Sequence, residues 1–114
     1  MHELSIAHSI LSIAERALPA DSKAVITAVS LEIGELSSIE IDALRFAFDA
    51  IKPKTVVQNA ELNIDLIPGE AECSGCATVF HMESYGSCCP QCKGYLVKIL
   101  KGKELKVLSI TVEE

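Results

Sequence analysis

The sequence CSGC at residues 73–76, followed after twelve residues by CPQC at residues 89–92, organises the rest of the chain. Two C-x-x-C pairs at this separation are typical of one tetrahedral Cys₄ metal site, because each pair forms a tight turn that directs two thiolates towards the same ion. Zinc is the metal that this ligand set favours most. The alternatives are disulfides, or cysteines that are merely buried. The spacing therefore predicts a zinc site with the ligands Cys73, Cys76, Cys89 and Cys92.

Four protein ligands leave no open position for water or substrate, so the predicted role of the zinc is structural. Cys88 is a fifth cysteine and directly precedes Cys89. Spacing favours Cys88 as a bystander, because its use would turn the second pair into C-x-x-x-C, although an exchange of the two ligands stays open. Iron in place of zinc would make a rubredoxin-like electron-transfer protein, which a red colour would reveal.

Length, composition and charge bound the class of protein. With 114 residues, 49% of them apolar, the chain fits one small globular domain that carries a smaller module. Residues 1–72 hold twelve acidic and five basic side chains, and the lysine excess of residues 73–112 nearly vanishes once four thiolates bind Zn²⁺. We therefore expect no nucleic-acid partner. The chain lacks both a membrane-length apolar run and the basic start of a signal peptide, which predicts a cytoplasmic protein without a membrane partner.

Apolar periodicity predicts two helices and several strands. A period of 3.6 predicts a helix over residues 4–18 and a second helix that ends near Ile51. A capping box, in which Ser37 bonds the amide of Glu40 and Glu40 reaches back, predicts the start of the second helix. Strands are expected at residues 24–33, with Val25, Val29, Leu31 and Ile33 on one face, and at 60–66, 78–83, 95–101 and 104–112.

Turn residues bound the cysteine module. Pro68-Gly69 precedes the module, and Gly102-Lys103 permits a tight return of the chain after it. The strand at 104–112 is long enough to leave the module and rejoin the main sheet. We therefore expect a first domain made of residues 1–68 with 104–114, and a zinc-ribbon domain made of residues 69–103.

A second candidate metal site lies at the N-terminus, where Met1, His2 and Glu3 precede the first helix. The terminal amine, the His2 imidazole and the adjoining amide nitrogens can converge on one metal through small chelate rings. A nearly planar nitrogen set suits Ni²⁺ or Cu²⁺, and binding would release protons. The alternative is a His2 side chain that is only solvent-exposed. His8 is expected on the surface, and His81 as a solvated or hydrogen-bonded ring.

Motifs for catalysis are not found in the sequence. The chain has no Ser-His-Asp nucleophile elbow, no glycine-rich phosphate loop and no H-E-x-x-H zinc motif. Its acidic pairs fall on predicted helix or strand surfaces. We therefore expect a protein that is not an enzyme.

The segments MHELSIA at residues 1–7, LEIGELS at 31–37, LRFAF at 44–48 and AEL at 60–62 precede the paired cysteines in that order. Together they resemble the HypA/HybF family of hydrogenase maturation nickel chaperones, over essentially the whole chain. The resemblance implies an α+β fold, with two helices packed on a three-stranded antiparallel sheet and an inserted Cys₄ zinc-ribbon module. Ala77 stands where the family often has glycine and where a positive φ is expected.

The resemblance also implies the function of a nickel metallochaperone. Nickel would be held by Met1, His2 and Glu3, with Ni(II) as the transported cargo and Zn(II) as the structural metal. The implied partners are a HypB-type GTPase and the hydrogenase large subunit, and the expected oligomeric state is a monomer or weak homodimer. The residues leave open an alternative function, a zinc-ribbon adaptor that handles no nickel and binds protein, or nucleic acid through Lys98, Lys101, Lys103 and Lys106.

Overall fold

The computed structural model describes residues 2–19 and 23–113. Across these residues the elements, in order, are α1 (Glu3–Ala17), β1 (Val25–Gly34), α2 (Ile41–Ile51), β2 (Glu61–Ile67), β3 (Glu70–Cys73), β4 (Val79–His81), β5 (Val97–Lys101) and β6 (Leu105–Glu113). The strands form two three-stranded sheets, with the orders β2-β1-β6 and β4-β3-β5. The chain groups into a helix unit, Met1–Leu31 with Ile39–Ile64 and Val107–Glu114, and a ribbon unit, Glu32–Ser38 with Asp65–Lys106. The predicted α+β class is confirmed.

Helix α1 forms from residues whose apolar side chains recur on one face. Ile6, Ala7, Ile10 and Ala14 are buried, at the spacing of one side of a 3.6-residue helix. The predicted helix over residues 4–18 is therefore confirmed to within one residue at each end. Leu4, in contrast, is 51% exposed, because it lies at the edge of the apolar arc in the first turn.

Helix α2 ends at Ile51, as predicted, but its start differs from the prediction. The helix begins at Ile41 with Glu40 as its N-cap, and no side chain caps it. Instead of capping the helix, Ser37 belongs to a turn in which its amide donates to the carbonyl oxygen of Gly34 (3.0 Å). The capping-box prediction was wrong, since a tight turn after β1 uses the residues that would have formed the cap.

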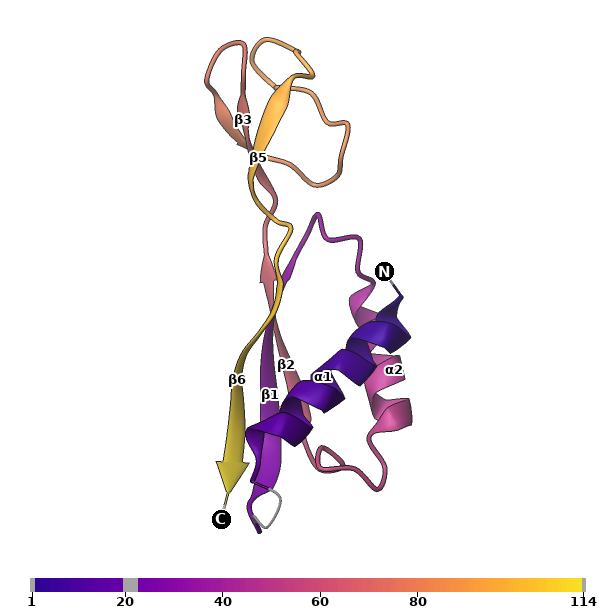
Figure 1. The fold of residues 1–114 in the computed structure, drawn as a ribbon. Helices are drawn as coiled ribbons and strands as arrows, with labels where there is room; N and C mark the ends of the chain where they lie inside the picture. The colour runs from indigo at the N-terminus through magenta and orange to yellow at the C-terminus, as the bar shows by residue number, and fades with distance from the viewer. Residues whose placement is uncertain (1, 20–22, 114) are drawn as a thin grey trace. The chain divides into compact units, whose positions relative to one another are not determined.

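The sheet β2-β1-β6 confirms that the last strand rejoins the main sheet. Helices α1 and α2 pack against each other and lie on one side of this sheet (Figure 1). In β1 the predicted alternation holds at Val29, Leu31 and Ile33, which are all buried. At the start of the strand it is wrong, because Ile26 is buried and Val25 is 46% exposed. The alternation thus shifts by one residue between Ile26 and Val29.

The ribbon unit has its own antiparallel sheet, β4-β3-β5. In its centre Ala71 of β3 pairs with Phe80 of β4 and with Ile99 of β5. Strand β3 was not predicted, because its sequence Glu-Ala-Glu-Cys is short and has one apolar residue before the cysteine. The core of the unit consists of Leu36, Ala71 and Met82, with Phe80, Val97 and Ile99 packed against it.

A turn that follows β1 completes this core. The amide of Glu35 donates to the carbonyl oxygen of Ile67 (2.8 Å), and the amide of Leu36 donates to that of Gly102 (2.6 Å). Gly34 approaches the Gly102 backbone so closely that a Cβ atom on Gly34 would collide with its carbonyl oxygen. This close approach brings Leu36 into the ribbon core, where it is 3% exposed.

Candidate metal centre

The first cysteine pair is shaped by backbone hydrogen bonds at the end of β3. The amide of Gly75 donates to the Sγ atom of Cys73 (3.3 Å), and the amide of Ala77 donates to the carbonyl oxygen of Cys73 (2.8 Å). Ala77 has a φ of 62°, so the positive φ expected at this residue is present. These bonds fold the pair into a tight knuckle that places the sulfur of Cys76 beside that of Cys73.

The second cysteine pair repeats this arrangement in a loop outside any strand. The amide of Gln91 donates to the Sγ atom of Cys89 (3.4 Å), and the amide of Lys93 donates to the carbonyl oxygen of Cys89 (2.9 Å). Lys93 has a φ of 65°. The same hydrogen bonds recur, and the residue after each C-x-x-C pair has a left-handed backbone conformation. The two knuckles therefore have the same local geometry.

The two knuckles bring four sulfur atoms together. The Sγ atoms of Cys73 and Cys92 are 3.4 Å apart, and those of Cys76 and Cys89 are 3.6 Å apart. All four lie within 4.8 Å of one another. A tetrahedron with metal–sulfur bonds of about 2.3 Å has sulfur–sulfur edges of about 3.8 Å, close to these distances. The donor set and its spacing therefore fit a single tetrahedral metal ion.

The four ligand positions differ in exposure and in acidity. Cys73 and Cys89, the first cysteine of each pair, are buried, whereas Cys76 and Cys92 are exposed. The side chain and amide of Thr78 lower the pKa of Cys76 to about 6, and the hydroxyl lies 3.1 Å from the sulfur. The amide of Gly94 favours the Cys92 thiolate, but hydrogen bonds with the other cysteines raise the pKa of Cys92 to about 11.

The opposite shifts have two physical causes: hydrogen-bond donors lower the pKa of Cys76 and Cys89, whereas the neighbouring sulfurs raise that of Cys92. A thiolate is stabilised by donors such as the Cys92 amide, which lowers the pKa of Cys89. Several negative charges at this separation repel one another, so the protein groups alone do not favour full ionisation. A divalent cation supplies the missing positive charge. The cluster can therefore hold a metal as a set of thiolates, with release of protons on binding.

Cys88 lies outside this cluster. It is half-buried and is not part of the sulfur group within 4.8 Å, which in the described residues consists of Cys73, Cys76, Cys89 and Cys92. The second pair of the cluster is therefore Cys89 and Cys92, with the C-x-x-C spacing that the sequence predicted. Its place next to Cys89 makes Cys88 a matched control for variants of the cluster.

The N-terminal candidate site is described from His2 onwards, and Met1 lies outside the described residues. His2 is exposed, has extended backbone angles and is the N-cap of α1. Glu3 is half-buried and is the first helical residue. Apart from the cysteine cluster, residues 2–19 and 23–113 hold no group of three His, Cys, Asp or Glu side chains placed to share a metal ion.

His81 has a partner that the sequence did not reveal. Its Nε2 atom lies 2.7 Å from the Oε1 atom of Glu35, which confirms the expectation of a solvated or hydrogen-bonded ring. The amide of Gly69 donates to the same carboxylate oxygen (2.9 Å). The Gly69 amide, followed by His81, lowers the pKa of Glu35. No local pattern could have found this pair, because the two residues are 46 positions apart.

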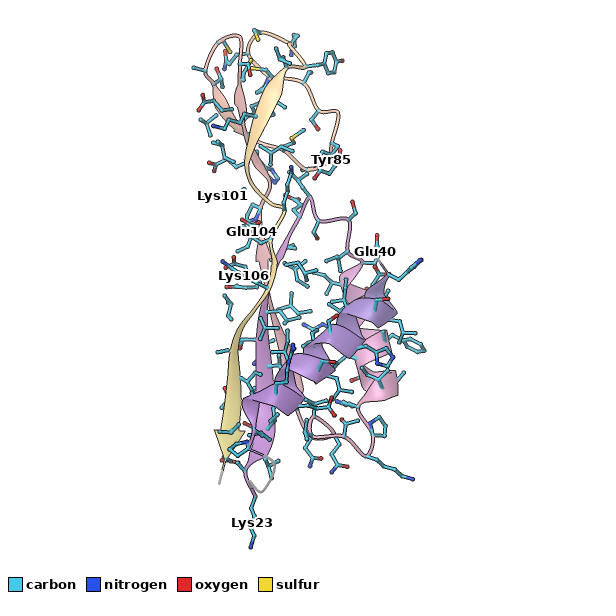
Figure 2. All side chains as sticks on the ribbon, in the orientation of Figure 1. Lys23, Glu40, Tyr85, Lys101, Glu104 and Lys106 are labelled. Atoms are coloured by element: carbon cyan, nitrogen blue, oxygen red, sulfur yellow. The ribbon has the colours of Figure 1, made fainter. Side chains whose placement is uncertain are left out.

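Two lysines of the ribbon unit lie beside acidic residues. Lys98 pairs with Glu72 across the β3–β5 ladder, and the Nζ atom of Lys106 lies 3.3 Å from the Oε1 atom of Glu32. Lys101 at the end of β5, Glu104 in the connection and Lys106 in β6 follow one another along the chain (Figure 2). This mixture of charges does not favour a phosphate-binding surface. Among the described residues, no helix is long and apolar enough to cross a bilayer.

Comparison with known proteins gives a consistent result. A family model described as "Hydrogenase/urease nickel incorporation, metallochaperone, hypA" matches residues 1–112. The hydrogenase maturation factor HypA of Parabacteroides distasonis is 45% identical over 114 residues, which cover 100% of this chain and 99% of that protein. That of Geobacter sulfurreducens is 42% identical over 113 residues, covering 99% and 100%.

A solved structure shares the fold. The solution structure of the nickel metallochaperone HypA from Helicobacter pylori superposes with a TM-score of 0.63 at 30% sequence identity. The match covers 96% of this chain and 96% of that one. The similarity therefore extends over both the helices and the cysteine-bearing part of the sequence.

Proposed function

The chain belongs to the HypA family of metallochaperones for hydrogenase and urease nickel incorporation, and we propose that it binds Ni(II) at its own N-terminus for hydrogenase maturation. Members of this family are maturation factors rather than catalysts. The proposed ligands are the amine of Met1, the imidazole and amide of His2, and Glu3 through its amide or carboxylate. The nickel is cargo, to be released to an acceptor.

The start of α1 supports this site. The first helical hydrogen bond runs from the amide of Ile6 to the carbonyl oxygen of His2 (3.2 Å). A helix leaves the amides of its N-cap and first turn without an intrahelical acceptor, so the amides of His2 and Glu3 precede the helical ladder. Nickel can bind these nitrogens without unwinding α1. The positive end of the helix dipole also favours the negative charge of a deprotonated amide.

We further propose that the four cysteines hold a structural zinc ion. The supporting observation is the cluster of four sulfurs with near-tetrahedral spacing. A closed Cys₄ site offers no position to substrate, so this metal stays in place while the nickel is exchanged. In this proposal, residues 1–68 with 104–114 form the nickel-binding domain, and residues 69–103 form the zinc-ribbon domain.

The proposed partners are a HypB-type GTPase and the hydrogenase large subunit, in the cytoplasm. A site at the chain terminus with few side-chain ligands suits transfer, because an acceptor can approach it from several directions. Nickel-loaded protein is expected to raise the nickel content of a large-subunit precursor when the GTPase is present. Protein with His2→Ala is expected to leave that content unchanged.

Nickel titration of the untagged protein tests the nickel site directly. We expect His2→Ala to abolish nickel binding while zinc content, measured by inductively coupled plasma mass spectrometry, is unchanged. His8→Ala is the matched control, because His8 is exposed on the same helix, and it should bind nickel like the wild type. Acetylation of the terminal amine should have the effect of His2→Ala. Equal nickel binding by wild type and His2→Ala would overturn the proposal.

A further inference from the structure

Strand β6 forms one edge of the sheet β2-β1-β6, and among the described residues β1 is the strand that pairs with it. Figure 1 shows β6 as the yellow arrow at the margin of this sheet. A strand at an edge directs alternate N–H and C=O groups outward, away from its neighbour in the sheet. Residues 107–112 of β6 belong to the helix unit and read Val-Leu-Ser-Ile-Thr-Val. We call residues 107–112 the open edge.

The open edge lacks the features that usually prevent an edge strand from pairing with another chain. Proteins protect such strands with charged side chains, proline, bulges or very short length. The open edge contains no charged residue, proline or glycine, and four of its six residues are β-branched. Its side chains also reach the surface, since Leu108 is 48% and Val112 is 42% exposed. An uncharged and exposed run of this length readily pairs with a second extended chain.

The other edges of the two sheets, in the part of the chain that the structure describes, are protected. Strand β2, at the opposite edge of the same sheet, carries the exposed polar residues Glu61, Asn63 and Asp65. In the ribbon sheet, β4 is three residues long and β5 contains the exposed Lys98 and Lys101. Charge or short length therefore guards each of these strands. The open edge differs from all of them.

The charges of the helix unit favour a basic partner at the open edge. The sequence of this unit, Met1–Leu31 with Ile39–Ile64 and Val107–Glu114, holds nine acidic and five basic side chains. Glu113 directly follows the open edge and is exposed. An acidic surface attracts a basic segment and repels an acidic one. Two helix units of this net charge also repel each other, so the charge disfavours a second copy of the chain.

We propose that the open edge binds an extended, basic segment of a partner protein, which pairs with β6 as a fourth strand of the sheet. This mode of binding is β-augmentation, in which main-chain hydrogen bonds supply affinity and the side chains supply specificity. Apolar residues of the segment cover Leu108 and Val112, and a lysine or arginine at its end lies beside Glu113. The open edge contains no proposed nickel or zinc ligand, so the inference does not rest on the proposed function.

A synthetic peptide tests the open edge directly. The probe has three threonine–valine pairs with a lysine at each end, and it is added up to about 2 mM to the ¹⁵N-labelled, zinc-loaded full chain. We expect the amide resonances of residues 107–112 to shift and those of β2 to stay in place. A peptide with proline at its two central positions is the control, because proline has no N–H to donate, and it should not bind. Shifts that are absent from residues 107–112, or centred on β2, would overturn the proposal.

A charged substitution in the open edge should weaken this binding. Leu108→Lys introduces the kind of charge that protects other edge strands, and it should raise the dissociation constant of the peptide about tenfold. Asn63→Lys is the matched control, because it places the same charge at an exposed position of β2, and it should bind like the wild type. Circular dichroism shows whether each variant keeps its fold. Equal binding by the wild type and a folded Leu108→Lys would overturn the proposal.

Two further measurements identify the occupant. A peptide with glutamate in place of both lysines should bind about threefold more weakly at low salt, and equal affinity would contradict the basic character of the partner. Sedimentation velocity of the wild type without peptide, at about 100 μM, should show a monomer. A dimer that Leu108→Lys abolishes and Asn63→Lys retains would overturn the proposal, because the open edge would then pair with a second copy of the chain.

Discussion

The Nε2 atom of His81 lies 2.7 Å from the Oε1 atom of Glu35, so a side chain of β4 is joined to the turn that follows β1. The amide of Gly69 donates to the same oxygen atom (2.9 Å). Three segments of the ribbon unit, distant in sequence, therefore meet at one carboxylate. This carboxylate holds the turn whose next residue, Leu36, lies in the ribbon core.

Replacing this carboxylate should change the pH dependence of stability. The Gly69 amide and His81 lower the pKa of Glu35 from its usual 4.5, so the ionised form stabilises the folded state above about pH 4.5. This contribution is lost as the pH falls through the lowered folded-state pKa. The melting temperature of Glu35→Gln should therefore be below that of the wild type at pH 7, and the difference should shrink below about pH 4.5.

Differential scanning calorimetry of the two proteins over this pH range measures the effect. Metal analysis at each pH restricts the comparison to conditions in which both proteins keep the metal, because its loss would itself unfold the ribbon strands around Glu35. Glu83→Gln, at an exposed residue of the same unit, is the control and should follow the wild type. A difference that stays constant with pH would contradict the assigned role of Glu35.

Ala77→Gly should stabilise the first knuckle. Ala77 has a φ of 62°, in the left-handed region that costs a residue with a Cβ atom about 1–2 kcal/mol. Glycine removes this cost but adds about 0.4–1 kcal/mol of chain entropy to the unfolded state, so the net gain is about 0.5–1 kcal/mol. Urea denaturation of the zinc-loaded protein should show this gain in the free energy of unfolding. Ala77→Val should instead lower the free energy of unfolding. Lys93, with a φ of 65°, should respond in the same way to glycine.

Leu36→Ala should destabilise the ribbon unit by about 3 kcal/mol, since the substitution leaves a cavity beside Ala71 and Met82. Leu96→Ala is the matched control, because Leu96 is 77% exposed, and its effect should stay within about 0.5 kcal/mol. Amide hydrogen exchange of β3 and β5 reports on the ribbon unit itself. Equal effects of the two substitutions would show that Leu36 does not support the ribbon core.

Cys89→Ser should lose the zinc, and Cys88→Ser should keep it. Cys89 belongs to the sulfur cluster and its neighbour does not. Binding of a structural zinc ion can contribute on the order of 10–16 kcal/mol to the folding of a small module, so Cys89→Ser should also unfold the ribbon strands. Metal analysis and hydrogen exchange measure the two effects. If Cys88→Ser lost the zinc and Cys89→Ser kept it, Cys88 rather than Cys89 would be the ligand.

Much of the fold was predictable because its signals are local. The helix at α1, the strand β2 and the two knuckles each depend on residues within a few positions of one another. The convergence of the four cysteines followed from spacing alone, since two knuckles that face each other define a tetrahedron. Nickel binding at the N-terminus stays a prediction.

The features that sequence reasoning missed depend on partners far along the chain. The cap expected at Ser37 was replaced by a turn that uses the carbonyl oxygens of Gly34, Ile67 and Gly102. The start of β1 buries Ile26 instead of Val25, although both are β-branched and equally suited to a strand. The partner of His81 is Glu35, which is 46 positions away in the sequence. Nothing in the residues around Glu35 indicates this contact. Tertiary packing decided each of these outcomes.

The position of Leu36 makes the zinc ribbon difficult to transplant. If residues 69–103 were excised, Leu36 would remain in the host without Ala71 and Met82, which now cover it. If the same residues were grafted onto another protein, they would lack a side chain of their own core. The smallest portable piece is therefore discontinuous, Glu32–Ser38 together with Asp65–Lys106. A chimera that carries only residues 69–103 should bind zinc but have a lower melting temperature than the ribbon unit of this chain.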